Sequence, residues 1–152
     1  MELKENYNKL RKIYRLPRFE HINNEFEIMT IDKKEFLLRE IRRKISERLE
    51  LFAKLLEGIL QPETSLTNLY ESKVFKDKER EEIYALYKKI MFFDRMSVET
   101  AINETEEKTA DFIKALWNEW TNIKKGLEPV VKKIKDSWKK DSEFKVELSY
   151  IR

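Results

Sequence analysis

The sequence contains no cysteine, which excludes disulfides, zinc–thiolate sites and cysteine nucleophiles. It also holds only 2 glycines and 3 prolines, whereas strand-rich folds need many tight turns built from these residues. Gly58 and Gly126 lie far apart in the chain. Walker A loops and dinucleotide-binding fingerprints both require clustered glycines, so both are excluded. The scarcity of turn residues favours a few long elements joined by short links.

Histidine is almost as scarce, since His21 is the only one. Di-iron sites in helical bundles use two Glu-x-x-His motifs, and zinc hydrolases use two or three histidine ligands, so neither site can be built here. His21 lies in a polar stretch without a nucleophile motif nearby, and we interpret it as a surface residue. The pattern indicates no catalytic residue, metal, cofactor or small-molecule substrate, and we expect the protein not to be an enzyme.

Long apolar runs are missing as well. No stretch approaches the 18 apolar residues that a membrane-spanning helix needs, and the first residues, Met1 to Glu5, are charged rather than apolar. We therefore expect no transmembrane segment and a cytoplasmic location.

The chain does have a high content of charged and of apolar residues. Among 152 residues, 40% are charged, with 32 basic against 29 acidic side chains, and 41% are hydrophobic. Such balanced charge is typical of solvated helical surfaces, and the apolar content is too high for a disordered chain. We predict an all-α fold in a single helical domain over residues 1–152, with 141–152 as a flexible or extended tail.

Apolar residues recur every three or four positions along most of the chain, which is the spacing of one face of a helix. The longest such stripe runs from Leu38 to Ile59, and it predicts a central helix that Asp32 and Glu35 cap. Gly126 suits a helix C-cap and Pro129 suits a first turn, so they predict a break between two helices. The expected helices cover 2–15, 18–26, 33–60, 64–75, 78–103, 106–124 and 129–140.

These segments predict an antiparallel helical bundle of about four long helices with an N-terminal helical arm. Two segments depart from helical spacing. Apolar and polar residues alternate over 26–30 and, more regularly, over 143–150, so the two could pair as a minor two-stranded ribbon. The alternatives are an extended linker at 26–30 and a frayed or helical tail, or a tail that adds to the sheet edge of a partner.

Two basic clusters are candidate binding sites for an anionic partner such as a nucleic acid, an acidic protein or a membrane surface. One is a basic C-terminal helix, with seven lysines against Glu128 and Asp136 between residues 121 and 140. The other is an arginine cluster on the central helix. The alternatives are solvated lysines and ordinary helical ion pairs. The candidates are Arg39, Arg42, Arg43, Lys124, Lys125, Lys132, Lys133, Lys135, Lys139 and Lys140.

Aromatic and apolar side chains near the C-terminus are candidates for a protein interface, because tryptophan is enriched in interface hot spots as well as in cores. They are Trp117, Trp120, Trp138, Phe144, Val146, Leu148 and Tyr150. Asp94 and Arg95 interrupt an apolar run from Met91 to Met96, which indicates either a structural ion pair or a polar contact for a partner.

The sequence thus favours a non-enzymatic helical interaction or adaptor protein that binds another macromolecule, either another protein or a second copy of itself. The alternative is a nucleic-acid or ribonucleoprotein-associated factor that uses the basic helix surfaces.

Overall fold

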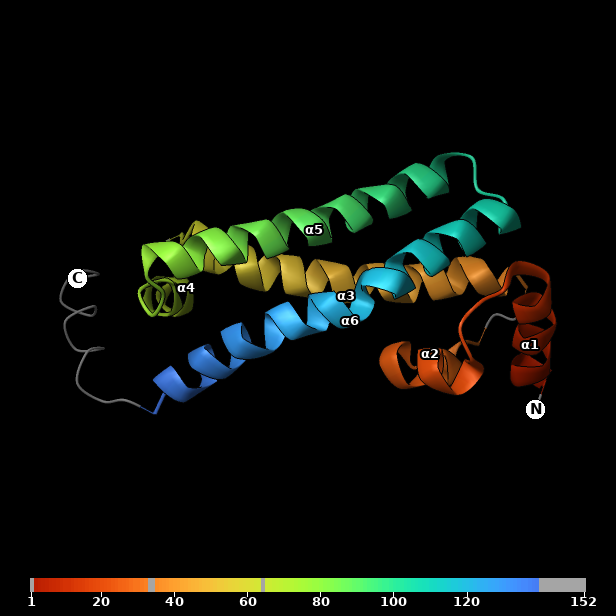
Figure 1. Ribbon diagram of the computed structural model, residues 1–152, viewed down its shortest axis with the longest axis horizontal. Coiled ribbons are helices and arrows are strands. Elements are labelled where there is room, and N and C mark those ends of the chain that lie inside the picture. The colour runs from red at the N-terminus through yellow and green to blue at the C-terminus, as the bar shows by residue number, and fades with distance from the viewer. Residues whose placement is uncertain (1, 33–34, 64, 140–152) are drawn as a thin grey trace. The chain divides into compact units, whose positions relative to one another are not determined.

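The computed structural model describes residues 2–32, 35–63 and 65–139, and within them all regular secondary structure is helical. This confirms the predicted all-α helical bundle. Its elements, shown in Figure 1, are α1 (Glu2–Tyr14), α2 (Phe19–Phe26), the 3-10 helix η1 (Ile28–Thr30), α3 (Leu37–Leu60), α4 (Leu66–Ser72), α5 (Asp77–Ile102) and α6 (Glu106–Ser137).

The chain forms two compact units, each assembled from two separate stretches. Unit 1 comprises Met1–Glu50 and Phe92–Thr121, and unit 2 comprises Leu51–Met91 and Asn122–Arg152. The three long helices α3, α5 and α6 therefore each contribute one part to unit 1 and the other part to unit 2.

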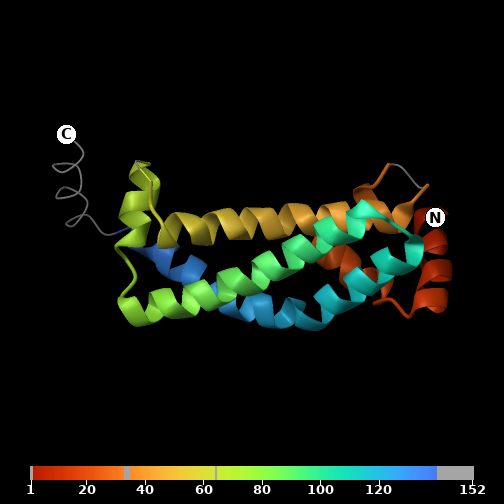
Figure 2. The same cartoon turned by 90° about the horizontal axis from the view of Figure 1, so that it is seen from above.

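In unit 1 the N-terminal helices α1 and α2 lie beside the first turns of α3 (Figures 1 and 2). The Tyr7 hydroxyl donates a hydrogen bond of 2.6 Å to the Pro17 carbonyl, which fixes the turn between α1 and α2. From α2, Phe26 packs against Trp120 of α6, with ring centroids 4.9 Å apart. The apolar stripe that predicted α3 supplies the fully buried Ile41 and Ile45.

In unit 2 the short helix α4 lies across the C-terminal end of α3 (Figures 1 and 2). The last carbonyls of a helix have no partner inside the helix, so outside donors must satisfy them. Here the Ser72 hydroxyl of α4 and the Arg80 guanidinium of α5 both donate to the Ile59 carbonyl, at 2.7 and 3.0 Å. Ser65 caps α4 by accepting from the Asn68 amide.

The predicted break between 124 and 129 is wrong, because α6 continues from Glu106 to Ser137 with Gly126 and Pro129 inside it. The described chain therefore has three long helices rather than four. The physical reason is the apolar stripe, which runs through both residues without a change of spacing. Its buried members around them are Ile123, Leu127, Val130 and Ile134.

The strand predicted at 26–30 is also wrong. Glu27 adopts a left-handed conformation with φ of 54°, so the chain leaves α2 and enters the 3-10 turn η1. Ile28 is nevertheless fully buried, as expected of a linker that fills the core, although this linker is a turn rather than an extended segment. Phe36 has φ of 57°, so α3 starts only at Leu37, later than the predicted cap implied. The other half of the predicted ribbon, 143–150, lies outside the described residues.

Candidate interaction surfaces

The C-terminal part of α5 exposes large apolar side chains in unit 1. Phe92 is 61% exposed and Ile102 is 72% exposed, and Val98 between them is also exposed. The charged residues Arg95 and Glu99 share this solvent-facing side of the helix. We call Phe92, Arg95, Val98, Glu99 and Ile102 the α5 outer face. A stable helix normally directs such apolar residues inward, so this face requires an explanation.

The inward side of the same segment carries polar residues instead. Asp94, Ser97 and Thr100 are all buried. The Ser97 hydroxyl lies 2.6 Å from the Ser46 hydroxyl of α3 and accepts a hydrogen bond of 3.1 Å from Arg42. Burial of Ser97 and Asp94 is compensated by hydrogen bonds within unit 1, since Asp94 accepts from Arg95. In this segment the buried side of α5 therefore combines Phe93 with polar groups, while its exposed side carries large apolar residues.

An open groove of about 650 Å³ runs beside the α5 outer face, between the end of α5 and the start of α6. Apolar atoms of Met96, Ile102 and Phe112 line it, and Lys108 and Asp111 bring opposite charges to it. Ile102 belongs both to the groove and to the α5 outer face, so the two features form one continuous surface. The volume of the groove lies within the range of about 300–1,000 Å³ that is common for binding sites.

A buried ion pair holds this surface in place. The Arg42 guanidinium binds Glu104 through two hydrogen bonds, of 2.8 Å from Nε and 2.9 Å from Nη2. Glu104 lies in the link between α5 and α6, and it also accepts a hydrogen bond of 2.7 Å from Thr109. Its side chain is only 8% exposed. The pair therefore connects α3 to the α5–α6 link that borders the groove.

The environment of Glu104 sets its ionisation. Burial alone would raise the pKa of this carboxyl, but hydrogen bonds from Arg42 and Thr109 and the charges of Arg42 and Arg39 hold the pKa below its ordinary value of 4.5. A carboxyl with a lowered pKa in the folded state stabilises the fold above its unfolded-state pKa, and this contribution disappears as the pH falls through the folded-state pKa.

We expect Glu104→Gln to lower the free energy of unfolding at pH 7, and we expect the difference from the wild type to shrink below about pH 4.5, the ordinary pKa of this carboxyl. Urea unfolding of both proteins at several pH values between 7 and 3 measures this. A difference that stays constant over the whole range would show that ionised Glu104 does not stabilise the fold.

The three candidate arginines lie in unit 1, and acidic residues neutralise them there. Arg42 is buried against Glu104, so it is not available to an outside anion. The Arg39 Nε lies 3.3 Å from the same carboxylate, and its guanidinium stacks 4.7 Å from the centroid of the Phe36 ring. Arg43 pairs with Glu40 one turn away. The Arg43–Glu40 pair is of the local helical kind that the sequence offered as the alternative, whereas Arg39 and Arg42 pair with Glu104, which lies far from them in the chain.

The candidate lysines within α6 lie on two sides of the helix, and Lys139 follows its end at Ser137. Helical spacing brings Lys124, Lys125, Lys132 and Lys135 onto one side over about 17 Å. This lysine stripe includes acidic residues, since both Lys132 and Lys135 pair with Asp136. Lys133 points to the other side and pairs with Glu79 of α5 at 2.6 Å. Lys140 lies outside the described residues.

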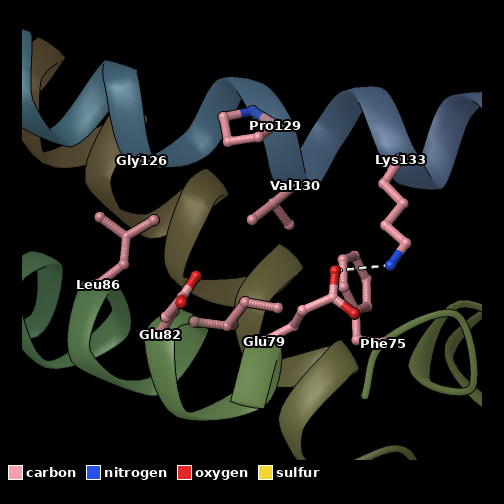
Figure 3. Close-up of a pocket in the computed structure, with 9 residues that line it drawn as sticks. Phe75, Glu79, Glu82, Leu86, Gly126, Pro129, Val130 and Lys133 are labelled. Carbon is pink, nitrogen blue, oxygen red and sulfur yellow. Dashed lines mark hydrogen bonds and ion pairs between the residues drawn. The ribbon is translucent and has the colours of Figure 1, made fainter. Parts of the chain in front are cut away.

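Lys133 borders a notch of about 170 Å³ between α5 and α6 in unit 2 (Figure 3). The notch exists where Gly126 lets the helices approach, because a Cβ at this position would come within 3.1 Å of Leu86. The hydrogen bond from Lys133 lowers the pKa of Glu79, so the ion pair across the notch stays charged. The notch is smaller than pockets that hold small-molecule ligands.

The predicted aromatic interface residues separate by burial. Trp120 is a core residue of unit 1 whose indole nitrogen donates a hydrogen bond of 2.6 Å to Glu25, so it does not face a partner. Trp117 is partly exposed and packs edge-on against Phe26. In unit 2, Trp138 is 44% exposed and stacks on Tyr70. The remaining candidates lie outside the described residues, namely Phe144, Val146, Leu148 and Tyr150.

Asp94 and Arg95 pair with each other at 2.6 Å rather than across the bundle. The carboxylate is buried, whereas the Arg95 side chain is 69% exposed. The α5 outer face was missed by sequence reasoning, which singled out only Asp94 and Arg95 in this segment. The signal that could have found it is the position of Phe92 and Ile102, which lie on the side of the helix opposite Ile90 and Phe93.

These features describe an all-α protein in which unit 1 combines exposed apolar side chains on α5 with buried polar contacts. Over the described ranges, no helix is long and apolar enough to cross a membrane, and no cluster of three or more histidine or acidic side chains could hold a metal ion. No protein-family model, curated protein or solved structure matches this sequence. Its function must therefore be inferred from the chemistry of its surface.

Proposed function

We propose that this protein is a non-enzymatic helical interaction module that binds a protein partner through the α5 outer face. The observation that supports this most strongly is the exposure of Phe92, Val98 and Ile102 within eleven residues of one helix. Single exposed apolar residues are ordinary, but three large ones on one side of a helix, beside a groove, favour a binding surface. When a partner covers these apolar side chains, each Å² of apolar surface removed from water would contribute roughly 25 cal/mol to the free energy of binding.

The surroundings of the face support the same function. Arg42 binds Glu104 and Ser97, so α5 and the α5–α6 link are fixed before any partner arrives. A surface that is already ordered loses less conformational entropy on binding. The exposed charges of Arg95 and Glu99 lie between the apolar residues, where they can select a partner of complementary charge.

A second candidate function is binding of a nucleic acid, and the lysine stripe of α6 favours it. Lysines can neutralise phosphates without reading the base sequence, and such binding weakens steeply as salt rises. Asp136 pairs with two of these lysines, and Glu128 also lies among them. These acids reduce the attraction for phosphates, so the α5 outer face is the better supported binding surface.

A capture experiment with the tagged full-length chain tests the proposed function. We expect Ile102→Lys to reduce capture of a protein partner from native lysate by roughly tenfold or more, because a lysine in an apolar contact loses its hydration. Ile13→Lys is the matched control, since Ile13 of α1 is also exposed, at 67%, but lies outside the α5 outer face. Capture is read by mass spectrometry, and thermal unfolding confirms that both variants fold.

The same experiment includes nuclease treatment and a salt series. If both variants capture as much protein as the wild type, the α5 outer face is not the binding surface. If capture depends on nuclease and salt but not on Ile102, the lysine stripe carries the function instead.

A further inference from the structure

We infer that the protein partner of the α5 outer face is a second copy of this chain, bound in an antiparallel, two-fold symmetric arrangement. This inference rests on the proposed function and names the partner of the same surface. It follows from the order of apolar and charged residues along α5. Phe92, Arg95, Glu99 and Ile102 each meet a complementary residue when α5 is paired with itself in the opposite direction.

The first step is the spacing. Phe92, Arg95, Glu99 and Ile102 are separated by three, four and three residues, so they form one stripe along the solvent-facing side of α5. This is the spacing of the seam in a coiled-coil helix pair. In unit 1 the stripe lies opposite the buried side of the helix, and a second helix can therefore approach along its whole length.

The second step is the symmetry. In a two-fold symmetric dimer the same patch serves both copies, so each residue faces a fixed counterpart. With the axis at the height of Ser97, midway along the stripe, Phe92 faces Ile102 of the second copy. Arg95 faces Glu99 of the second copy, and both pairs occur twice. Apolar residues thus meet apolar residues, and opposite charges meet at the centre.

The other orientation is disfavoured by the same residues. A parallel pair in register would place Arg95 against Arg95 and Glu99 against Glu99, and juxtaposed like charges are repulsive. The exposure and the remaining hydrogen-bond donors of Arg95 are compatible with the antiparallel pair. Only its Nη1 is used by Asp94 in the same chain, and the side chain is 69% exposed, so its remaining donors can reach a second carboxylate.

The third step is the groove. It adjoins Ile102, which is the residue that Phe92 of the second copy meets. The aromatic ring can therefore extend from the seam toward Met96 and Phe112, which line the groove. A stable interface buries roughly 1,200–2,000 Å² in total, and the groove adds surface from α6 to the contact between the two α5 helices.

Analytical ultracentrifugation of the full-length chain over a concentration series tests this inference. We expect the apparent mass to rise with concentration from the monomer value of 18.6 kDa toward twice that value. Arg95→Glu and Glu99→Arg should each weaken self-association by roughly tenfold or more, because each places like charges opposite one another. An equimolar mixture of the two variants should associate again, since each charge then faces its opposite. Ile13→Lys should associate like the wild type.

A monomer at every concentration would overturn the inference, as would charge variants that associate as strongly as the wild type or a mixture that stays monomeric. The proposed function would still be supported after any of these outcomes if Ile102→Lys captured less of a protein partner than the wild type did. If neither self-association nor capture depends on the α5 outer face, both proposals fail. Circular dichroism tests whether each variant is folded. If one variant does not fold, the concentration series of the wild type still decides whether the chain associates with itself.

Discussion

Arg42→Ala should lower the free energy of unfolding by about 3–5 kcal/mol, the loss expected when one partner of a buried ion pair is removed. The guanidinium makes two hydrogen bonds to Glu104 and one to Ser97, and all three would be lost. The Glu104 carboxylate would remain in a site where only 8% of its side chain is exposed. For a domain of this length, such a loss corresponds to a fall in Tm on the order of 10 °C.

Urea unfolding followed by circular dichroism measures the effect, and Arg43→Ala is the matched control. Arg43 lies next to Arg42 on α3, but its pair with Glu40 is at the surface, where ion pairs contribute about 0–1 kcal/mol. The double variant Arg42→Met with Glu104→Leu should recover part of the loss, because it leaves no buried charge unpaired. A loss below about 1 kcal/mol for Arg42→Ala would show that water or another residue replaces the guanidinium.

Pro129→Ala should raise the free energy of unfolding by up to about 3 kcal/mol, the difference between proline and alanine inside a helix. Pro129 has no N–H to donate to the carbonyl four residues earlier, and its ring opposes that carbonyl. The residue is exposed within α6, so alanine would restore the helical hydrogen bond and lose little packing. If Pro129 instead began a separate helix, the substitution would be nearly neutral.

Thermal and urea unfolding compare Pro129→Ala with Pro62→Ala. Pro62 follows the end of α3 in a non-helical link, where proline stabilises by restricting the unfolded chain, so its loss should be neutral or slightly unfavourable. Hydrogen exchange at the amide of residue 129 would show directly whether the new bond forms. A less stable Pro129→Ala would mean that the proline ring is needed for packing around the notch, which it lines.

The helices were predictable wherever local and long-range signals agree. Pro17 and Pro62 follow the ends of α1 and α3, because proline cannot continue a helix, and Thr105 caps α6 by accepting from the Lys108 amide. At Gly126 and Pro129 the signals disagree. Glycine and proline inside a helix are less favourable than alanine by about 1 and about 3 kcal/mol, which indicated a break, while the apolar spacing indicated one helix. Burial of the continuous apolar face decided the outcome, because its gain adds up over several turns.

The candidate surface was less predictable, because the sequence shows which residues share a helix face but not what that face meets. The arginine cluster was visible in the sequence, yet Glu104 lies 62 positions after Arg42 and no local rule joins them. The α5 outer face was hidden for a related reason. An apolar residue in a helix is normally assigned to the core, and the burial of Ser97 and Asp94 beside Phe93 shows which side of α5 faces inward.

The division of α3, α5 and α6 between two units has a consequence for inheritance. The chain passes from one unit to the other at three places, after Glu50, after Met91 and after Thr121. A single contiguous gene segment thus encodes neither unit alone, and recombination at one crossover would leave each product with an incomplete core. Domain shuffling could move this protein only as a whole, so its two units are expected to have diverged together in the same lineages.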